Sequence, residues 1–462
     1  MGNMVLKSIN NHLWYKLGSK TLSCIEGDIF MDSIWTKTIN LPQFPALEGD
    51  IKTDVLIIGG GMAGILCANF LQEQGVDYVL AEGRTICSGV TKNTTAKITS
   101  QHGLIYQKLR KSVGSELAAM YLDANEAAVR KYTELAKKID CDFERKTNYV
   151  YSLNDRRKLE KEAESLDALG FHSVFTEETK LPFQVAGAIG FENQAQFHPL
   201  KFVAELAKNL RIYEHTYVKE LKPHMAVTGH GNIHFQKVIF ATHFPVDNKH
   251  GMYFLKMYQH RSYVIGYENA PNVEGMYVDE TMNGMSFRNY GDLLFVGGGD
   301  HRTGKKGGNW REIREFVRVH YPEAREVAHW ATQDCMSLDE VPYIGQYSKR
   351  LPECYVATGF NKWGMTSAMV AGQILADLVQ GKENKYEAVF NPSRSMRKTQ
   401  FLVNGAEAVM NLVWPAKKRC PHMGCGLKWN EQEHSWDCPC HGSRFGEDGG
   451  VIEGPATGDL GK

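Results

Sequence analysis

The most regular pattern of apolar residues lies near the start of the chain, between residues 54 and 83. An unbroken apolar run at residues 55–58 predicts a strand of a parallel sheet that is buried on both faces. After a glycine-rich turn, Leu66, Phe70 and Leu71 share one face at helical spacing, and residues 78–81 form a second apolar run. The order strand, helix, strand predicts an α/β unit with a parallel sheet.

Two later stretches repeat this pattern, and two others depart from it. Residues 237–245 (KVIFATHFP) predict another buried strand, and residues 354–381 predict a strand, a glycine-rich turn and a helix. Polar and apolar residues alternate in 252–267 and 284–299, as in an antiparallel sheet with one face toward water. We therefore expect a parallel sheet to which the chain returns twice, with segments of an antiparallel sheet inserted between.

Composition and charge narrow the classes of protein that the chain can represent. A chain of 462 residues is too long for one hydrophobic core, so we expect two or three domains. Lys plus Arg and Asp plus Glu are both 53, so no net field favours nucleic acid or an anionic membrane surface. We expect no membrane span, because glycines and an asparagine interrupt the most hydrophobic stretch, residues 55–71.

The first residues and the cysteine content indicate the compartment. Residues 1–30 lack a compact apolar region and a small-residue cleavage site, so a signal peptide is not expected. The stretch that Met31 opens is typical of a natural start, which makes the preceding residues an upstream extension. Ten cysteines in 462 residues do not form a secreted disulfide framework, so we expect a cytoplasmic protein.

The glycine-rich turn after the first strand has the spacing of a dinucleotide site. Gly59, Gly61 and Gly64 match G-x-G-x-x-G: they allow the tight turn, the approach of a pyrophosphate and close packing of helix on strand. The phosphates are then bound at a helix N-terminus. Glu82, followed by Gly83, ends the second strand, where an acid bonds the ribose hydroxyls. The alternative is a glycine-rich turn of another α/β protein.

These residues resemble the D-amino-acid-oxidase-like family of FAD-dependent oxidoreductases. The resemblance covers about residues 50–385 and depends on GGGMAG, VIFAT and the DEVPYIG and YVATGFNKWGMT motifs within 339–366. It implies FAD, bound with its isoalloxazine ring beside the last glycine-rich turn and helix. The residues that it places there are Gly359, Trp363, Gly364, Met365 and Thr366.

The same resemblance implies further contacts with the cofactor. The family wraps the flavin with a segment like GVTKNTTAKITSQHG (89–103), in which Thr94, Thr95 and Lys97 offer donors to anionic oxygens; a solvated polar loop is the alternative. Residues 213–221 correspond to the strand whose backbone meets the adenine at Val218. His198, before Pro199, is expected to cap or pack a helix and not to be catalytic.

The substrate site is expected under the antiparallel sheet that, in this family, covers the flavin. Arg261, Tyr263 and Arg288 are the candidate catalytic residues, because an arginine can hold a carboxylate with two hydrogen bonds. The alternative for each arginine is a solvated face or a surface ion pair. We find no Ser-His-Asp arrangement and no paired carboxylates, so the chemistry is expected to be that of the flavin.

The end of the chain contains a dense group of cysteines and histidines. Cys420-x-His422 and Cys438-x-x-His441 are separated by the 15 residues 423–437. Two cysteines and two histidines are the ligands of a Rieske centre, in which one iron takes two thiolates and the other two imidazoles. A zinc site and a disulfide staple are the alternatives, but zinc fingers usually pair C-x2–4-C with H-x3–5-H.

The flanking residues resemble the Rieske domains of respiratory and photosynthetic cytochrome complexes, C-x-H-x-G-C and C-P-C-H-G-S. The resemblance implies a disulfide between Cys425 and Cys440 and a hydrogen bond from Ser443 to a bridging sulfur. Position 445 is Phe where those proteins have a Tyr that donates to a ligating sulfur. Loss of that donor predicts a lower reduction potential, because such bonds stabilise the reduced cluster.

Along nearly its whole length the chain resembles FAD-dependent oxidoreductases with a C-terminal Rieske domain. The predicted fold is an α/β Rossmann-type FAD domain with an inserted antiparallel-sheet substrate domain, followed by a small all-β Rieske domain. The predicted boundaries are an N-terminal extension at 1–45, the flavin enzyme at 46–390 and the Rieske domain at 400–462. Within the enzyme, nucleotide segments at about 51–145, 190–248 and 330–385 alternate with substrate-domain segments at about 146–189 and 249–329.

Two cofactors in one chain predict a redox enzyme with three alternative uses. The first is a dehydrogenase that oxidises an amine or amino acid and passes electrons from FAD through the [2Fe–2S] cluster to a ferredoxin-like or other one-electron carrier. The second is a reductase that works in the reverse direction on a C=C or C=N bond. The third is a redox sensor or electron-transfer protein without a substrate.

Overall fold

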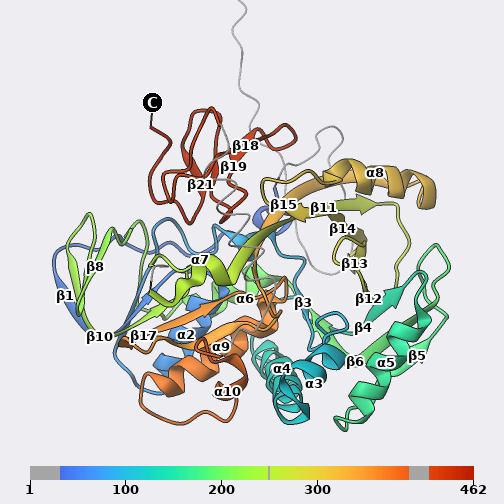
Figure 1. The fold of residues 1–462 in the computed structure, drawn as a ribbon, viewed down its shortest axis with the longest axis horizontal. Coiled ribbons are helices and arrows are strands. Elements are labelled where there is room, and N and C mark those ends of the chain that lie inside the picture. The colour runs from blue at the N-terminus through green and yellow to red at the C-terminus, as the bar shows by residue number, and fades with distance from the viewer. Residues whose placement is uncertain (1–31, 248–249, 395–415, 462) are drawn as a thin grey trace, which may run out of the picture.

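The computed structural model describes residues 32–247, 250–394 and 416–461. Within these ranges the strands form three sheets, two large ones side by side and a small one at the C-terminal end (Figure 1). Residues 1–31, the first part of the predicted N-terminal extension, and residues 395–415, which include the start of the predicted Rieske domain, lie outside the described residues.

The first sheet is the parallel sheet that the apolar runs predict. β1 pairs in parallel with β10 and with β2, so that Ile57 lies between Ile239 and Leu80. β17 continues the parallel order beyond β10, whereas β16 and β9 run antiparallel to their neighbours. In spatial order the strands are β16 (Tyr343–Ser348), β17 (Leu351–Thr358), β10 (Asn232–Phe240), β1 (Ile51–Ile58), β2 (Tyr78–Ala81) and β7 (Ile212–Tyr213), and the hairpin β8 (Glu220–Lys222) and β9 (Met225–Val227) extends from β10.

The second sheet is mostly antiparallel and is built from the inserted segments. Its order is β15 (Arg325–Ser337), β11 (Met257–Glu268), β14 (Leu293–Arg302), β13 (Ser286–Tyr290), β12 (Met276–Asp279), β4 (Glu144–Ser152), β6 (Gly187–Gln196) and β3 (Lys97–Ile98), with β5 (Val174–Thr176) beside β6. The predicted segment boundaries near 189 and 329 fall inside β6 and β15, because each of these strands belongs whole to this sheet.

Two stretches differ from the strands that the sequence predicts. Residues 252–256, the start of an expected strand, lie in η2 (His250–Met252) and α7 (Tyr253–Lys256), and β11 begins only at Met257. In the segment 213–221, residues 214–219 belong to no strand, because the chain must leave β7 and turn before it enters β8. A short apolar stretch does not by itself distinguish a strand from a turn.

Helices cover the outer face of the first sheet. α2 (Met62–Glu73) packs on α9 (Gly364–Leu378) so closely that a Cβ at Gly372 would lie 2.8 Å from the Phe70 ring. The other helices are α1 (Trp35–Thr38), η1 (Val90–Asn93), α3 (Tyr106–Val113), α4 (Ser115–Ala136), α5 (Arg156–Asp167), α6 (Pro199–Ala207), α8 (Asn309–His320) and α10 (Glu387–Phe390).

The described part of the predicted N-terminal extension is packed into the flavin domain. Trp35 in α1 is fully buried, and its Nε1 donates to the carbonyl oxygen of Thr94 at 2.7 Å. Its ring contacts that of His198, which caps α6: His198 Nδ1 accepts from the Lys201 N–H at 3.1 Å, and Pro199 is the first helical residue. The prediction that His198 caps a helix is confirmed.

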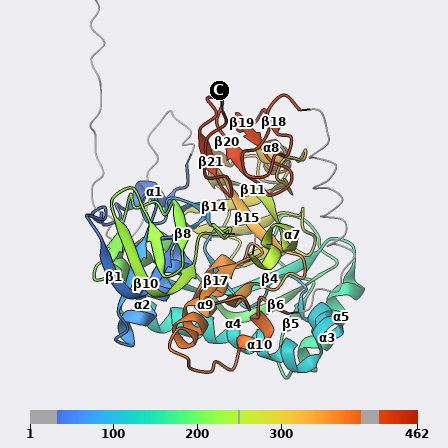
Figure 2. The same ribbon diagram turned by 60° about the vertical axis from the view of Figure 1, so that its left-hand side comes forward.

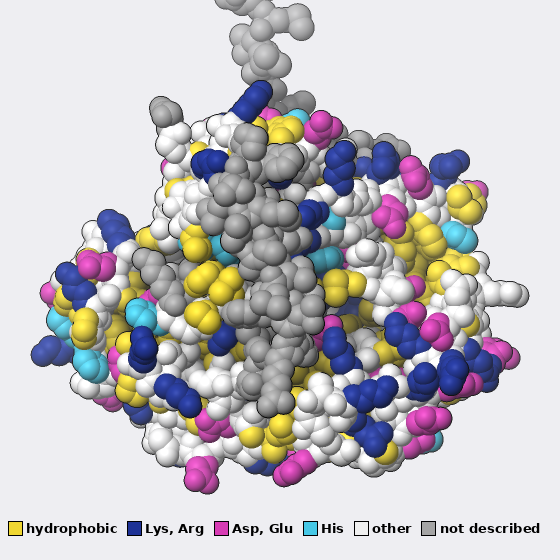
Figure 3. All heavy atoms as spheres, viewed as in Figure 1, with side chains coloured by type: hydrophobic (Ala, Val, Ile, Leu, Met, Phe, Trp, Pro, Cys, Tyr) yellow, Lys and Arg dark blue, Asp and Glu magenta, His cyan; other side chains and the backbone are white. Residues whose placement is uncertain are grey.

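The C-terminal sheet forms a separate small domain that lies against the second sheet. Its strands are β18 (Lys428–Asn430), β19 (Ser435–Asp437), β20 (Arg444–Phe445) and β21 (Val451–Glu453). Both ribbon views place it beside β11 and β15 (Figures 1 and 2). Charges of both signs are interspersed on the face drawn in Figure 3, in keeping with the equal numbers of acids and bases. Among the described helices, none is long and apolar enough to cross a membrane.

Candidate active site and metal centre

A cavity of about 810 Å³ lies where the two large sheets and the C-terminal domain meet. One end is formed by the turn after β1, which includes Gly59 and Gly61, and another part by Gly359 and the start of α9. Residues 451–457 of the C-terminal domain also line it. The cavity therefore extends past every segment in which the sequence predicts a contact with FAD.

The glycines of the first turn are required by close backbone approach. Gly59 has φ +108°, and a Cβ there would lie 2.6 Å from the carbonyl oxygen of Ala241. A Cβ at Gly64 would lie 1.9 Å from the carbonyl oxygen of Gly59, so only glycine lets α2 start this close to β1. At Gly61 a Cβ would meet only the Thr91 hydroxyl, at 3.4 Å, and would otherwise project into the cavity.

Replacing Gly61 with alanine is expected to weaken FAD binding without unfolding the protein. Gly61 has φ −79°, which alanine adopts freely, and the new methyl group would take space needed by the pyrophosphate. Overpacking of this kind costs about 1–3 kcal/mol, or roughly 5- to 150-fold in the dissociation constant of FAD. FAD retained after gel filtration and the thermal unfolding temperature measure the two effects.

The matched variant Gly64→Ala is expected to lose stability as well as FAD, because its methyl group would overlap the Gly59 carbonyl. Normal FAD retention in Gly61→Ala would contradict the prediction that Gly61 leaves space for the pyrophosphate.

The side of the cavity where adenine is predicted to bind contains the other residues of the fingerprint. Glu82 follows β2, and its carboxylate accepts from the N–H groups of Gly60 and Arg84 at 2.7 and 2.8 Å. Gly83 lies under the Tyr217 ring, where a Cβ would come within 2.9 Å of Cδ2. Val218 is buried and lines the cavity. Their contacts with ribose and adenine stay predictions.

The opposite side is organised around His102, which the sequence places in the segment expected to wrap the flavin but to which it assigns no structural role. His102 is buried; its Nδ1 lies 2.6 Å from the Tyr121 hydroxyl and its Nε2 lies 3.0 Å from the Thr366 hydroxyl. Its ring stacks on that of Trp363 at 5.0 Å. His102 thus ties the 89–103 segment to the start of α9. Its position within the TTAKITSQHG motif is the feature of the sequence that could have indicated this role.

The residues predicted to surround the flavin ring all lie at this side. Gly359 has φ +70° at the turn after β17, and Trp363 precedes the first residue of α9, Gly364. Met365 is buried and, like Gly364, lines the cavity; the carbonyl oxygen of Met365 accepts from the Tyr132 hydroxyl at 3.0 Å. A helix start beside this cavity fits a flavin ring.

The 94–97 segment faces the same space with one buried cation. Lys97 Nζ donates to the Thr95 hydroxyl at 3.3 Å, and the Thr94 hydroxyl accepts from the Ala96 N–H at 2.9 Å. Burial, reinforced by Arg288, lowers the pKa of Lys97 to about 7. A buried ammonium that lines a cavity is stabilised by a bound anion, which agrees with its predicted role toward FAD.

Arg261 and Arg288, predicted to hold a substrate carboxylate, lie elsewhere. Neither is among the described residues that line the cavity. Arg288 is fully buried, and its Nη1 donates to the carbonyl oxygens of Thr95 and Ala96 at 2.6 and 3.2 Å, so it holds the 94–97 segment in place. Both guanidinium groups bind groups of the protein itself, whereas Arg288 Nη2 has no partner among the described residues, so the roles of the two arginines toward a substrate stay predictions.

Arg261 binds two carboxylates of the C-terminal domain. Its Nε lies 3.1 Å from Glu433 Oε1, its Nη2 also contacts Glu433, and its Nη1 lies 3.2 Å from Glu453 Oε2. The Tyr263 hydroxyl donates to the same Glu433 at 2.8 Å and lies 2.8 Å from His301 Nε2. Tyr263 also lines the cavity, so a catalytic role for it stays a prediction.

The two C-terminal loops with ligand-type residues have the same backbone geometry. In the first, the Cys420 N–H donates to the Cys425 carbonyl at 2.9 Å; in the second, the Cys438 N–H donates to the Ser443 carbonyl at 2.8 Å. The fourth residue after each cysteine is a glycine with positive φ, +76° at 424 and +83° at 442, whose N–H donates back to that cysteine. Two matching turns present their side chains toward one another.

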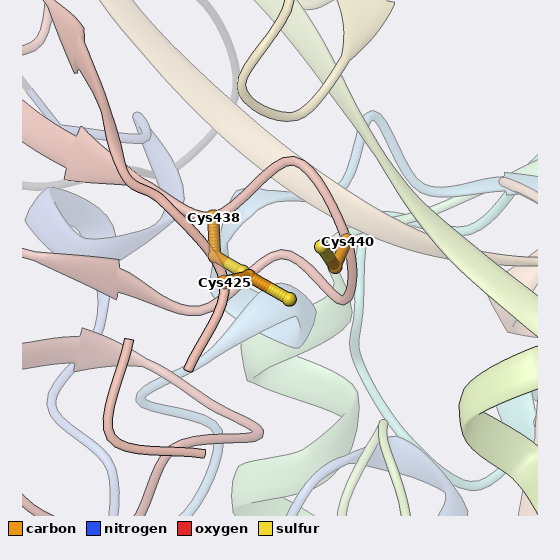
Figure 4. A group of neighbouring side chains, drawn as sticks. All are labelled: Cys425, Cys438 and Cys440. Atoms are coloured by element: carbon orange, nitrogen blue, oxygen red, sulfur yellow. The ribbon is translucent and has the colours of Figure 1, made fainter. Parts of the chain in front are cut away.

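The cysteines and histidines of these loops converge on one point. The sulfur atoms of Cys425, Cys438 and Cys440 lie within 4.8 Å of one another (Figure 4), and Cys420 contacts Cys438. The His422 and His441 rings are 5.1 Å apart. No S–S bond joins Cys425 to Cys440 in the described chain, so their pairing stays a prediction.

The donor set fits a [2Fe–2S] cluster with two thiolate and two imidazole ligands. His441 Nδ1 is buried and meets no hydrogen-bond partner within the described ranges, as expected of an atom that ligates a metal. Burial lowers the pKa of His441 to about 3, so the ring is neutral and its lone pair is available. The ligand assignment Cys420, His422, Cys438 and His441 remains the prediction that this arrangement supports.

Comparison with known proteins identifies both parts of the chain. The family model described as FAD dependent oxidoreductase matches residues 54–378, more than half of the chain. The chain belongs to this family. A Rieske [2Fe-2S] domain matches residues 398–462 of the oxidoreductase, so its cofactors are FAD and a [2Fe–2S] cluster.

Relatives of this oxidoreductase include one with the same combination of domains. The Bacillus subtilis (strain 168) protein YhfW, named as a Rieske 2Fe-2S iron-sulfur protein, is 33% identical over 93% of this chain and 97% of its own. Gamma-glutamylputrescine oxidoreductase of Escherichia coli (strain K12) is 22% identical over 75% of this chain and 88% of its own. The structure of glycine oxidase from Geobacillus kaustophilus has the same fold, with a TM-score of 0.63, 20% identity, and coverage of 75% of this chain and 100% of that one.

The Rieske domain of the oxidoreductase is held on the flavin domain by a buried network of charges. Glu433 lies between two guanidinium groups, Arg261 from β11 and Arg444 from β20, the latter at 2.8 Å. Arg444 also bonds Asp437 at 3.0 Å and Glu453 at 3.3 Å. Burial would raise the pKa of Glu433, but the two arginines outweigh it and hold that pKa at about 2. The sequence did not reveal this network.

Proposed function

We propose that this protein is a dehydrogenase for an amine or amino-acid substrate, which passes electrons from the FAD site through the [2Fe–2S] site to an external one-electron carrier of the ferredoxin type. A cytoplasmic location is part of the proposal. It rests on the cysteine content, because ten cysteines in 462 residues do not make a secreted disulfide framework.

One contact carries the proposal: a residue that lines the flavin cavity is bonded to a cluster loop. Gln333 of β15 lines the cavity, and its Nε2 donates to the carbonyl oxygen of Gly442 at 2.8 Å. Gly442 follows the predicted ligand His441 directly, and a Cβ at Gly442 would lie 2.2 Å from Gln259 Cγ of β11. The two cofactor sites are therefore joined by a short, packed path.

The cluster loop is enclosed on its other sides as well. His441 is 2% exposed, and its ring lies 6.1 Å from that of Phe254 in the flavin domain. Pro439 of the same loop packs against Gly304, where a Cβ would lie 2.8 Å from Pro439 Cα. These contacts pack the loop closely against the flavin domain, which favours electron transfer within the chain.

The reaction balances with a one-electron acceptor. A C–H bond next to the substrate nitrogen breaks, its hydrogen leaves as a hydride, and a C=N bond forms that water then hydrolyses. FAD supplies the site that accepts this electron pair, and the [2Fe–2S] cluster supplies the transfer of single electrons. Two molecules of oxidised carrier are reduced for each substrate. Relatives named as glycine oxidase and gamma-glutamylputrescine oxidoreductase support the choice of nitrogen compounds as substrates.

Anaerobic mixing of the purified holoprotein with a panel of amines and amino acids tests the proposal. We expect one compound to bleach the flavin absorbance and then to produce the rhombic EPR signal of a reduced Rieske cluster. In Gln333→Leu, bleaching should be unchanged and the cluster signal should rise severalfold more slowly, because the bond to Gly442 is lost. The exposed Gln432→Leu is the control.

Two results would contradict this proposal. In the first, every compound leaves the flavin oxidised, while dithionite-reduced protein is reoxidised by an unsaturated or imino compound, which is the reductase alternative. In the second, the flavin bleaches and the cluster stays oxidised in the wild-type protein.

A further inference from the structure

The cavity wall beside the start of α9 contains a group of polar side chains that lies outside the motifs of the sequence. Asp300 on β14 and Asp334 on β15 both line the cavity, and Lys362, just before Trp363, forms an ion pair with Asp300. Thr332 lies two residues before Asp334 on the same strand and also lines the cavity. The group is thus next to the residues predicted to surround the flavin ring.

Several of these polar atoms are buried without a partner. Thr332 is 9% exposed, and its hydroxyl makes no hydrogen bond with any described residue. The Asp300 side chain is also 9% exposed, and one of its oxygens, Oδ1, likewise bonds to nothing in the described ranges. Ser262 approaches this carboxylate from β11 without reaching hydrogen-bond geometry. Buried polar atoms of this kind require a ligand or water to satisfy them.

Strand geometry directs these side chains to one surface of the sheet. Ser262 and Thr332 are directly paired between β11 and β15, so they point to the same side, as does Asp334 two residues on. Arg261 and Tyr263 point to the other side, where they meet Glu433 of the Rieske domain. The acids therefore face the cavity, and the arginine faces away from it.

Most cations that line the cavity are already neutralised. Lys362 is paired with Asp300, Lys108 with Glu340, and Lys158 with Glu280. Lys97 has no acidic partner in the described part of the chain, and it lies beside Arg288 in the segment expected to contact the anionic oxygens of FAD. Beside the start of α9, the two carboxylates of Asp300 and Asp334 therefore lie near a single ammonium group, that of Lys362.

We propose that the substrate is an amine without a carboxylate on its reacting carbon, and that its nitrogen binds at Asp300 and Asp334. This inference rests on the proposed dehydrogenase function and narrows its substrate class. The amine N–H groups donate to Asp300 Oδ1, the Asp334 carboxylate and the Thr332 hydroxyl, which satisfies the buried acceptors.

The α-carboxylate of an amino acid would be placed in an unfavourable environment by the same wall. It would lie beside Asp300 and Asp334 in a site of low dielectric, where like charges repel strongly. The nearby Lys362 already neutralises Asp300. Burial raises the pKa of Asp334 to about 6. The amine nitrogen must lose a proton before the C–H bond breaks. Asp334 accepts that proton more readily than a surface carboxylate, whose pKa is lower.

Matched pairs of ligands test this inference by binding rather than by turnover. The pairs are butylamine and norvaline, phenethylamine and phenylalanine, and putrescine and ornithine, in which the amine is the amino acid without its carboxylate. Dissociation constants from anaerobic flavin difference spectra and calorimetry on the holoprotein are expected to favour the amine by about tenfold or more in at least one pair. If no amine binds more tightly than its amino acid, the proposal is overturned.

The variant Asp334→Asn is expected to weaken binding of the preferred amine about ten- to hundredfold, because a charge-assisted hydrogen bond is lost. Asp292→Asn, at an exposed position between β13 and β14, is the matched control and should bind as the wild type does. An Asp334→Asn protein with normal FAD content and unchanged amine affinity would also overturn the proposal.

The outcomes separate this inference from the proposed function. Tight amine binding that depends on Asp334, without bleaching of the flavin, would support the site and contradict the dehydrogenase. Bleaching by amino acids in preference to their amines would support the dehydrogenase and contradict the amine site.

Discussion

Replacing His441 with alanine is expected to remove the [2Fe–2S] cluster and to leave FAD in place. His441 is the buried imidazole whose Nδ1 is free to bind iron, and it is not among the described residues that line the flavin cavity. A cluster that loses one of its four protein ligands is not retained. We expect complete loss of the rhombic EPR signal and of bound iron, with a flavin absorbance close to that of the wild type.

The matched control is His434→Ala, four residues before Cys438, the first residue of the second cluster loop. His434 is exposed and forms an ion pair with Glu447 at 2.8 Å, so its loss should change neither cofactor. Anaerobic substrate should still bleach the flavin in His441→Ala, and electrons should no longer reach a one-electron dye at the wild-type rate. Loss of FAD together with iron would show that the two domains cannot fill their sites independently. An unchanged EPR signal would refute the ligand assignment.

Glu433→Gln is expected to destabilise the docked Rieske domain by about 3–5 kcal/mol, because two buried guanidinium groups lose the carboxylate between them. The pKa of Glu433 supports this size. A shift from 4.5 to about 2 corresponds to roughly 3 kcal/mol of preference for the charged carboxylate in the folded protein. Thermal and urea unfolding, followed by flavin release and by loss of the cluster absorbance, measure the change.

A second substitution distinguishes the charge network from simple loss of packing. Adding Arg261→Met to Glu433→Gln removes one of the two uncompensated cations, so the double variant should recover part of the lost stability. Glu431→Gln, on an exposed side chain of the same loop, is the control. A Glu433→Gln protein that unfolds at the wild-type temperature would mean that shape alone holds the interface.

The same carboxylate predicts how docking depends on pH. The folded-state pKa of Glu433 is lowered, so its contribution is fully present above about pH 4.5 and is lost as pH falls toward about 2. Wild-type stability should therefore decrease more steeply in this acid range than that of Glu433→Gln, which has no carboxyl to protonate at this position.

The cofactor sites can be predicted from the sequence because each is made by short local segments. Gly59, Gly61 and Gly64 lie in one turn, and their spacing follows from the close approach of Gly59 to Ala241 and of Gly64 to Gly59. The cluster loops are likewise local, with Gly424 and Gly442 at equivalent places. Such motifs carry their geometry within a few residues, so distant packing has little influence on them.

The polar group of Asp300, Asp334 and Thr332 could not be predicted from the sequence, because its position depends on which face of β11 lies toward the cavity. Alternation places Arg261 and Ser262 on opposite faces, but alternation does not say which face is covered by which neighbour. The partners that decide this, Glu433 and Glu453, are about 170 and 190 residues further along the chain. Asp300 and Asp334 are candidates because Arg261 points toward the Rieske domain, which leaves the opposite face of the sheet toward the cavity.

The contribution of residues 451–457 to the cavity wall has a consequence for how the protein is made. A ribosome releases the chain from its N-terminus onward, so the fingerprint glycines emerge hundreds of residues before this last segment. A flavin that binds to the nascent chain enters a site that is still open on one side. Residues 451–457 complete the wall only once the C-terminal sheet has folded, so this side of the cavity is the last part of it to form.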